Sequence, residues 1–140
     1  MTDDTHPEAH KPDIGVGSPA YLELVRFGEV LHDVFGARAY LVGSATRGKD
    51  FRDVDVRVML EDGENGEYWR WFPGGGMGGN DPKWNGICVA FSYYGAKMTG
   101  LNIDFQVQPI TEANVLYGSE FRQPLMLIDP PSERSDDDRT

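Results

Sequence analysis

The chain has 140 residues, 39% of them hydrophobic, which predicts one domain with a small core. Its formal net charge of -10 should repel DNA and RNA, so tight nonspecific nucleic-acid binding is not expected. No stretch reaches the roughly 18 apolar residues of a membrane helix, and the first residues carry no secretory-signal pattern. The single cysteine, Cys88, cannot form an internal disulfide. We therefore expect a cytoplasmic protein that does not associate with membranes.

Both ends of the chain are polar, rich in Asp, Pro and Ser, and poor in large apolar residues. Residues 1–17 and 131–140 are therefore predicted to be disordered tails, the second of them acidic, around a folded core of residues 18–130. His6 and His10 have the spacing of a helical metal site, but Pro7 disfavours the helix, so no metal site is expected there.

In the first half of the core, Ser18 and Pro19 suggest the N-cap and first residue of a helix. Apolar residues at helical spacing predict this helix over residues 20–35, and Gly36 ends it. His32 lies at the flank of the apolar stripe and is interpreted as a surface residue. Residues 37–42 are predicted to form a strand, followed by a turn over residues 43–52.

In the second half, alternation of polar and apolar residues predicts a strand over residues 54–60. A loop with seven glycines follows over residues 61–82, and its aromatic run at 68–72 is a short helix or strand that packs across the sheet. A helix over 83–98, a strand over 101–108 and a short helix over 111–117 complete the chain. The predicted fold is α/β, a small mixed β-sheet with helices packed on one face.

Carboxylates on the predicted strands are the main candidates for chemistry. Successive strand residues point to opposite faces, so Asp53, Asp55 and Arg57 share one face. Same-face neighbours lie roughly 6.5–7 Å apart, close enough for two carboxylates to hold one divalent ion. A strand with a solvated polar face has the same pattern, so this feature alone does not decide the question.

The strand over residues 101–108 repeats the pattern, with Asp104, Gln106 and Gln108 on its polar face. If the two strands are neighbours, Asp104 joins Asp53 and Asp55. Three clustered carboxylates repel one another unless cations neutralise them. Such an oxygen-rich site suits Mg²⁺ or Mn²⁺, above all when substrate phosphates complete the coordination shell.

The first strand runs into Gly43 and Ser44, which have the character of a phosphate-binding turn. Glycine permits a close backbone approach, and Ser44 adds a hydroxyl beside free N–H groups. Arg47 and Lys49 follow at positions from which they can meet the outer phosphates. An ordinary turn at the end of a strand is the alternative interpretation.

Together these segments resemble the nucleotidyltransferase superfamily of DNA polymerase β. The family pattern is a hydrophobic residue, Gly, Gly or Ser, a spacer, two acids separated by a hydrophobic residue, and a third acid on a later strand. It stands here as Val42, Gly43, Ser44, then Asp53, Val54, Asp55, and later Asp104. The resemblance covers roughly residues 20–110. Eight residues separate Ser44 from Asp53, a slightly tighter spacing than is usual. We expect no counterpart of the helical domain that follows the core in larger members.

The resemblance implies transfer of a nucleoside monophosphate from a triphosphate to a hydroxyl acceptor, with release of pyrophosphate. Asp53 and Asp55 would hold Mg²⁺ or Mn²⁺. Asp104 would help to hold the metal nearest the attacking hydroxyl and accept its proton. Gly43 and Ser44 would bind the β and γ phosphates. The predicted nucleotide-binding residues are thus Gly43, Ser44, Arg47 and Lys49.

Two other functions stay open at this point. One is a catalytically silent nucleotide-binding or regulatory module with the same fold, which pairs with another protein. The other is a nuclease-like metal hydrolase that uses the same acids. The acceptor of a transferase is equally open between a tRNA end, a protein side chain and a small hydroxylated molecule.

Competing motifs are weaker. Residues 43–50 are one residue short of a P-loop, because Asp50 stands where Ser or Thr should bind magnesium and a strand follows. Gly74, Gly76 and Gly79 fit a dinucleotide-binding spacing, but a flap over the nucleotide or simple slack is the better interpretation. Cys88 lies in an apolar segment and is read as a small core residue. Tryptophan side chains are able to stack on a base, but in a small domain they more often belong to the core. This second interpretation is preferred for Trp69, Trp71 and Trp84.

Overall fold

The computed structural model describes residues 12–78 and 80–126. Its elements in chain order are α1 (Ala20–Phe35), β1 (Ala39–Val42), the 3₁₀ turn η3 (Gly43–Thr46), β2 (Val54–Leu60), α2 (Glu67–Trp71), α3 (Pro82–Thr99), β3 (Ile103–Pro109), α4 (Ile110–Tyr117) and β4 (Gln123–Pro124). The predicted helices and the three longer strands are confirmed to within two residues at each end.

The strands form one mixed sheet in the order β3-β2-β1-β4. β1 runs antiparallel to both β2 and β4, whereas β2 and β3 are parallel. A parallel pair needs a crossover connection, and α3 supplies it. The register sets Asp55 opposite Asp104, so the two strands that carry these acids are neighbours.

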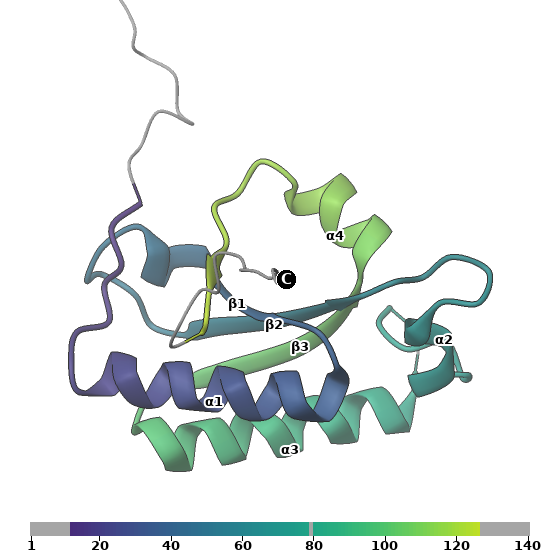
Figure 1. Cartoon of the computed structure of the whole chain (residues 1–140), viewed down its shortest axis with the longest axis horizontal. Helices are drawn as coiled ribbons and strands as arrows, with labels where there is room; N and C mark the ends of the chain where they lie inside the picture. Colours follow the sequence, from purple (N-terminus) through teal and green to yellow (C-terminus); the bar gives the residue numbers. More distant parts are fainter. Residues whose placement is uncertain (1–11, 79, 127–140) are drawn as a thin grey trace, which may run out of the picture.

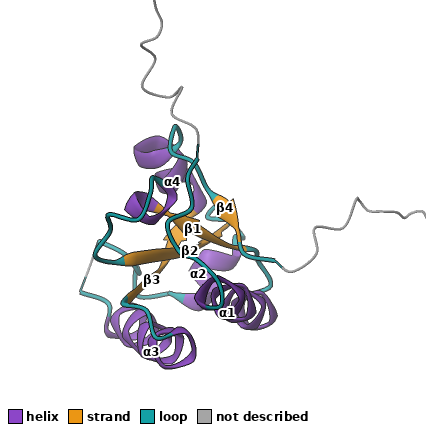
Figure 2. Ribbon diagram, turned by 90° about the vertical axis from the view of Figure 1, so that its left-hand side faces the viewer, coloured by secondary structure: helices purple, strands orange, loops and turns teal. Residues whose placement is uncertain are grey.

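The two long helices cover one face of this sheet (Figures 1 and 2). Val54, Val56 and Val58 of β2 are fully buried against them, together with Phe27 and Leu31 of α1. The short helix α4 lies on the other face, so the prediction that helices pack on one face holds only for α1 and α3. The sequence did not reveal this because α4 exposes most of its residues and has no strong apolar stripe.

Helix α1 ends as predicted but begins differently. Gly36, at φ 71°, donates its N–H to the carbonyl of His32 over 2.8 Å, the usual termination by a left-handed residue. Ser18 does not cap the helix: Pro19 occupies the N-cap position, and no side chain there accepts a hydrogen bond. The prediction of a serine cap is therefore wrong.

The glycine-rich loop is fixed to the start of α3. Asp81, only 5% exposed, caps that helix by accepting from the N–H of Lys83 at 3.0 Å. Its second oxygen accepts from the N–H of Gly76 at 2.8 Å, and the hydroxyl of Tyr68 accepts from the N–H of Met77 at 2.7 Å. The aromatic run forms α2 and packs Trp71 against Phe35, with ring centroids 4.7 Å apart.

The chain joins the fold before Ser18, earlier than the sequence suggested. The N–H of Asp13 donates to the carbonyl of Thr46 at 2.8 Å, and that of Gly15 donates to Ala45 at 2.7 Å. Val16 is 6% exposed and belongs to the core. Residues 13–16 therefore brace the η3 turn. Residues 1–11 and 127–140, which include His6, His10 and the predicted acidic tail, lie outside the described residues.

Within residues 12–78 and 80–126, none of the helices combines the length and the apolar character that crossing a membrane would demand.

Candidate functional site

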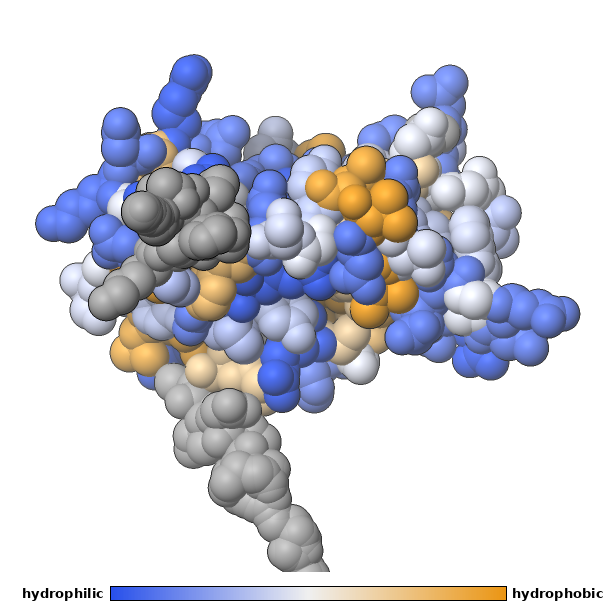
Figure 3. Space-filling model, turned by 90° about the horizontal axis from the view of Figure 1, so that it is seen from above, coloured by the Kyte–Doolittle hydropathy of each residue, from blue (hydrophilic) through white to orange (hydrophobic). Residues whose placement is uncertain are grey.

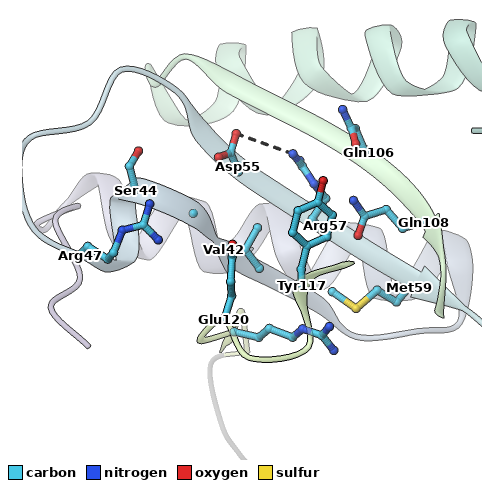
Figure 4. Close-up of a pocket in the computed structure, with 12 residues that line it drawn as sticks. Val42, Ser44, Arg47, Asp55, Arg57, Met59, Gln106, Gln108, Tyr117 and Glu120 are labelled. Atoms are coloured by element: carbon cyan, nitrogen blue, oxygen red, sulfur yellow. Dashed lines mark ion pairs between the residues drawn. The ribbon is translucent and has the colours of Figure 1, made fainter. Parts of the chain in front are cut away.

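A cavity of about 380 Å³ lies on the face of the sheet that α1 and α3 leave uncovered, beneath α4 and the chain that follows it (Figure 4). Its volume is within the roughly 300–1,000 Å³ of small-molecule sites. The turn after β1, the polar faces of β2 and β3, and the segment from α4 to β4 all contribute to it. The lining residues are Val42, Gly43, Ser44, Arg47, Asp55, Arg57, Met59, Gln106, Gln108, Tyr117, Glu120 and Arg122.

The charge of this cavity is opposite in sign to that of the chain. Three arginines line it, Arg47, Arg57 and Arg122, against two acids, Asp55 and Glu120. The whole chain has a formal net charge of -10. Arg57 is paired with Asp55 and Asp104, so Arg47 and Arg122 provide the positive charge for an anionic ligand.

Gly43 brings the end of β1 against the carboxylate of Asp55. Its φ of 78° is a conformation that residues with a side chain rarely adopt. A Cβ at this position would also collide with a carboxylate oxygen of Asp55. The hydroxyl of Thr46 closes the turn by donating to the carbonyl of Gly43 at 2.7 Å. Only glycine therefore lets the turn after β1 approach Asp55 this closely.

Asp55 and Asp104 face each other across β2 and β3, and Arg57 lies beside both. Its guanidinium is 3.8 Å from the carboxylate of Asp55 and 3.6 Å from that of Asp104. It also donates to the backbone carbonyl of Asp104 at 2.6 Å. The arginine side chain is only 12% exposed, so one largely buried cation serves both acids.

The pKa of Asp55 is raised above its ordinary value of 3.8. Burial of the carboxylate is the largest cause, and the charges of Asp104 and Asp53 add to it. The positive charge of Arg57 acts in the opposite direction without cancelling these effects. The folded chain therefore holds negative charge at Asp55 at a cost that a further cation would relieve.

Asp53 and Lys49 lie apart from this arrangement. Asp53 is exposed, and its carboxylate accepts a hydrogen bond from the amide of Asn102 at 2.7 Å. Lys49 is exposed and does not line the cavity. Among the predicted residues, the cavity brings together Gly43, Ser44, Arg47 and Asp55. Asp104 joins them through its contact with Arg57 and its register with Asp55.

The acids fit a divalent ion only as a site that is shared with substrate phosphates. In the part of the chain that the structure describes, no three His, Cys, Asp or Glu side chains form a group that could hold a metal ion. Asp55 and Asp104 are nevertheless a pair of oxygen donors beside a cation-rich cavity. Magnesium is often bound by one or two carboxylates with substrate phosphates completing its shell. The pair fits such a shared site and does not fit a metal cage made by the protein alone.

Several lining residues were visible in the sequence pattern but carried no assigned role. Period-two alternation places Arg57 and Met59 on the face of Asp55, and Gln106 and Gln108 on that of Asp104. The parallel register then brings these residues into one surface. No local signal identified Tyr117, Glu120 and Arg122, because they reach the cavity through the return of the chain from α4 to β4.

The competing features do not contribute to the cavity. Trp71 packs on Phe35, and Trp84 donates its indole N–H to the carbonyl of Val107 at 2.8 Å. Trp69 donates to the carbonyl of Asp62 at 2.9 Å. None of the three lines the cavity, and neither does any described residue of the glycine-rich loop. The idea of a flap over the nucleotide gains no support, and Gly79 lies outside the described residues.

Cys88 and Asp50 also agree with the simpler interpretations. Cys88 is 7% exposed within α3, and burial raises the pKa of its thiol to about 11, so it is a poor nucleophile at neutral pH. After Asp50 the chain enters β2 and not a helix, contrary to the requirement of a P-loop.

The face of the molecule that carries α4 is mostly hydrophilic, with apolar side chains in a few separate areas (Figure 3). Val115 and Leu116 of α4 are 77% and 55% exposed, the largest such fractions on that helix among the big hydrophobic side chains. Neither of these two side chains lines the cavity, to which α4 contributes Tyr117. Neither a protein-family model nor a curated protein or solved structure matches this chain.

Proposed function

We propose that the protein is a metal-dependent nucleotidyltransferase, which moves a nucleoside monophosphate from a triphosphate to a hydroxyl acceptor and releases pyrophosphate. The observation that carries the proposal is the position of Asp55. It lies in register with Asp104 on the next strand and against Gly43 at the end of β1. One point of the sheet thus combines a phosphate-binding turn with two facing carboxylates.

The triphosphate binds between the turn of Gly43 and Ser44 and the arginines of the cavity. Arg47 follows η3 directly, with its backbone N–H bonded to the carbonyl of Ser44 at 3.0 Å. Its side chain is exposed at the cavity mouth, where it can follow the outer phosphates. Arg57 lies deeper, beside the acids. The exposed guanidinium of Arg47 thus offers positive charge to a highly charged anion on an otherwise acidic protein.

Asp55 and Asp104 would hold Mg²⁺ or Mn²⁺ together with the phosphates, and such an ion would supply positive charge to the reacting phosphate group. The acceptor oxygen forms a bond to the α-phosphorus, and the bond from that phosphorus to the bridging oxygen breaks. Asp104 takes the proton of the acceptor hydroxyl. Arg57 orients Asp104 through its bonds to the carbonyl and carboxylate of that residue.

The acceptor approaches from the edge of the sheet. β3 is an edge strand, and the carboxylate side chain of Asp104 is 44% exposed. An acceptor on that side need not enter the cavity that holds the nucleotide. This arrangement is compatible with a large acceptor, such as a tRNA end or a protein side chain, as well as with a small hydroxylated molecule.

The experiment is incubation with each of the four α-labelled triphosphates, Mg²⁺ or Mn²⁺, and a cell extract from which proteins, RNA and small molecules are then separated. We expect pyrophosphate release and label in one fraction, which names the acceptor class. The matched control is Asp50→Asn, because Asp50 is an exposed acid that does not line the cavity. Label that persists in Asp55→Asn would contradict the proposal, and a cleaved polymer without pyrophosphate would favour a metal hydrolase.

A second candidate, a nucleotide-binding module without catalysis, is favoured by one observation. Arg57 already supplies a cation to both acids, and Asp53 is bonded to Asn102 and takes no part in that pair. A protein of this kind would bind triphosphates equally well with and without Mg²⁺. Calorimetry in magnesium and in EDTA separates the two: the transferase requires the metal for tight binding, and the module does not.

A further inference from the structure

Gln108 is a buried polar residue with an unused amide. It is 4% exposed and lines the cavity from the floor of β3. Its side chain makes no hydrogen bond to any residue that the structure describes, although nearly all buried amides in proteins are paired. Leaving such a group without a partner costs stability. A residue that weakens the free protein and faces a cavity is typical of a ligand contact.

The floor of the cavity formed by β2 and β3 has a charged end and an uncharged end. Asp55 and Met59 lie four residues apart on the same face of β2, so the cavity runs about 13 Å along the strands between them. At the first end are Gly43, Ser44, Arg47 and Asp55. At the far end the register pairs Met59 with Gln108, and Gln106 lies next to them on β3 (Figure 4). Tyr117 lines the cavity from α4.

A nucleotide has the same polarity, with a charged phosphate chain at one end and a flat, uncharged base at the other. The edge of every nucleobase carries donors and acceptors side by side, and a glutamine amide presents one of each in a plane. Met59 and Tyr117 supply the apolar and aromatic surfaces against which a base packs. We propose that Gln108, assisted by Gln106, binds the base of the nucleoside triphosphate and sets the base preference of the site.

This inference rests on the proposed function only in requiring that a triphosphate bind at Gly43 and Ser44. Nothing in it depends on transfer taking place, and it holds equally for a nucleotide-binding module. Its test can therefore use equilibrium binding without an acceptor.

The experiment measures the Kd of ATP, GTP, CTP, UTP and inorganic tripolyphosphate, each with Mg²⁺, for the wild type and for Gln108→Met. The variant keeps the length of the side chain and removes both hydrogen-bonding atoms. We expect the preferred triphosphate to bind about tenfold more weakly, the cost of roughly one buried hydrogen bond to a ligand. Differences among the four bases should largely disappear, while the Kd of tripolyphosphate should not change.

Two further variants keep the result interpretable. Gln106→Met, on the more exposed glutamine, should reduce base discrimination in the same direction, and Asn85→Leu, which removes an exposed amide at the start of α3, should change no Kd. The melting temperature of Gln108→Met should equal or exceed that of the wild type, since an unpaired amide is lost. If Gln108→Met and Gln106→Met both retain the affinities and preferences of the wild type, the inference is wrong and the proposed function stands. If the wild type binds neither triphosphates nor tripolyphosphate, the proposed function fails as well.

Discussion

Arg57 donates a 2.6 Å hydrogen bond to the backbone carbonyl of Asp104, and the same guanidinium approaches the carboxylate of that residue to 3.6 Å. The arginine therefore joins β2 to β3 at the point where their acids meet. A single side chain bridges the two acids and supplies a positive charge beside both carboxylates. The stability and the chemistry of the site depend on this contact.

Arg57→Met should destabilise the fold at neutral pH by about 1–3 kcal/mol, because two acids and a carbonyl lose their partner. This expected loss of stability is below the roughly 3–5 kcal/mol that is typical when a fully buried ion pair is broken, since Asp104 is partly solvated. Chemical denaturation at pH 7 and at pH 3 measures it. The loss should shrink at pH 3, because the raised pKa of Asp55 leaves that carboxyl largely uncharged there and without need of a cation. Magnesium should stabilise the variant more than the wild type, and an equal effect on both would contradict the role assigned to Arg57.

Asp55→Asn should make the protein more stable at pH 7. A carboxyl whose folded pKa is raised contributes stability that is fully present below its unfolded pKa, here the ordinary 3.8, and that is lost as pH rises from this value through the raised folded pKa. The wild type therefore loses stability above that pH and the variant does not. Thermal melting between pH 3 and pH 8 should show the two curves meeting at the acidic end. A variant that is less stable at pH 7 would mean that attraction to Arg57 outweighs burial.

Gly43→Ala should reduce stability and triphosphate binding together. Its matched control is Gly36→Ala, because Gly36 has a similar φ of 71° but open space where a Cβ would be added. Both variants incur the backbone strain of about 1–2 kcal/mol. Only the change at Gly43 also displaces the carboxylate of Asp55. Binding of magnesium-triphosphate should therefore fall in Gly43→Ala and remain normal in Gly36→Ala. Equal binding of magnesium-triphosphate by the two variants would mean that the turn at Gly43 does not contribute to nucleotide binding.

Asp104→Asn should separate binding from transfer. The asparagine keeps the shape and loses the proton acceptor, so triphosphate binding should largely survive while transfer falls by about 10²–10⁴. Asp53→Asn should have the smaller effect, since Asp53 bonds to Asn102 outside the cavity. Single-turnover assays with Kd measurements on both variants decide the roles. Normal transfer by Asp104→Asn would leave Asp104 as a polar residue on a partly solvated strand.

Much of the fold was predictable because its signals are local. Alternation over residues 54–60 and 103–107 identified both strands and the faces that carry Asp55 and Asp104, and Gly36 marked the end of α1. The placement of α4 was not predictable in this way. Its start is capped from a distance: the carboxylate of Asp62 accepts from the hydroxyl of Thr111 at 2.8 Å and from its N–H at 3.2 Å. Such a contact leaves no pattern within the helix itself.

The candidate site was only half predictable for the same reason. Spacing along one strand identifies which residues share a face, but not which neighbour lies alongside. The three acids were expected to converge, yet the register places Asp53 beside Asn102. Arg57 and Gln108 were assigned to the correct faces without a role, because their importance comes from what a second strand and α4 bring near them.

The parallel pairing of β2 with β3 has a consequence for how the chain acquires its site. Arg57 and Asp104 are 47 positions apart in sequence, with α3 between them. Contacts that close so long a loop cost more chain entropy than the antiparallel pairing of β1 with β2, and they form later. The turn at Gly43 and its antiparallel strand partner can assemble first, while the acidic pair awaits the crossover. We expect pulsed hydrogen exchange during refolding to protect β1 before β3, so that a chain arrested at this stage during synthesis has the turn at Gly43 but not yet the pairing of Asp55 with Asp104.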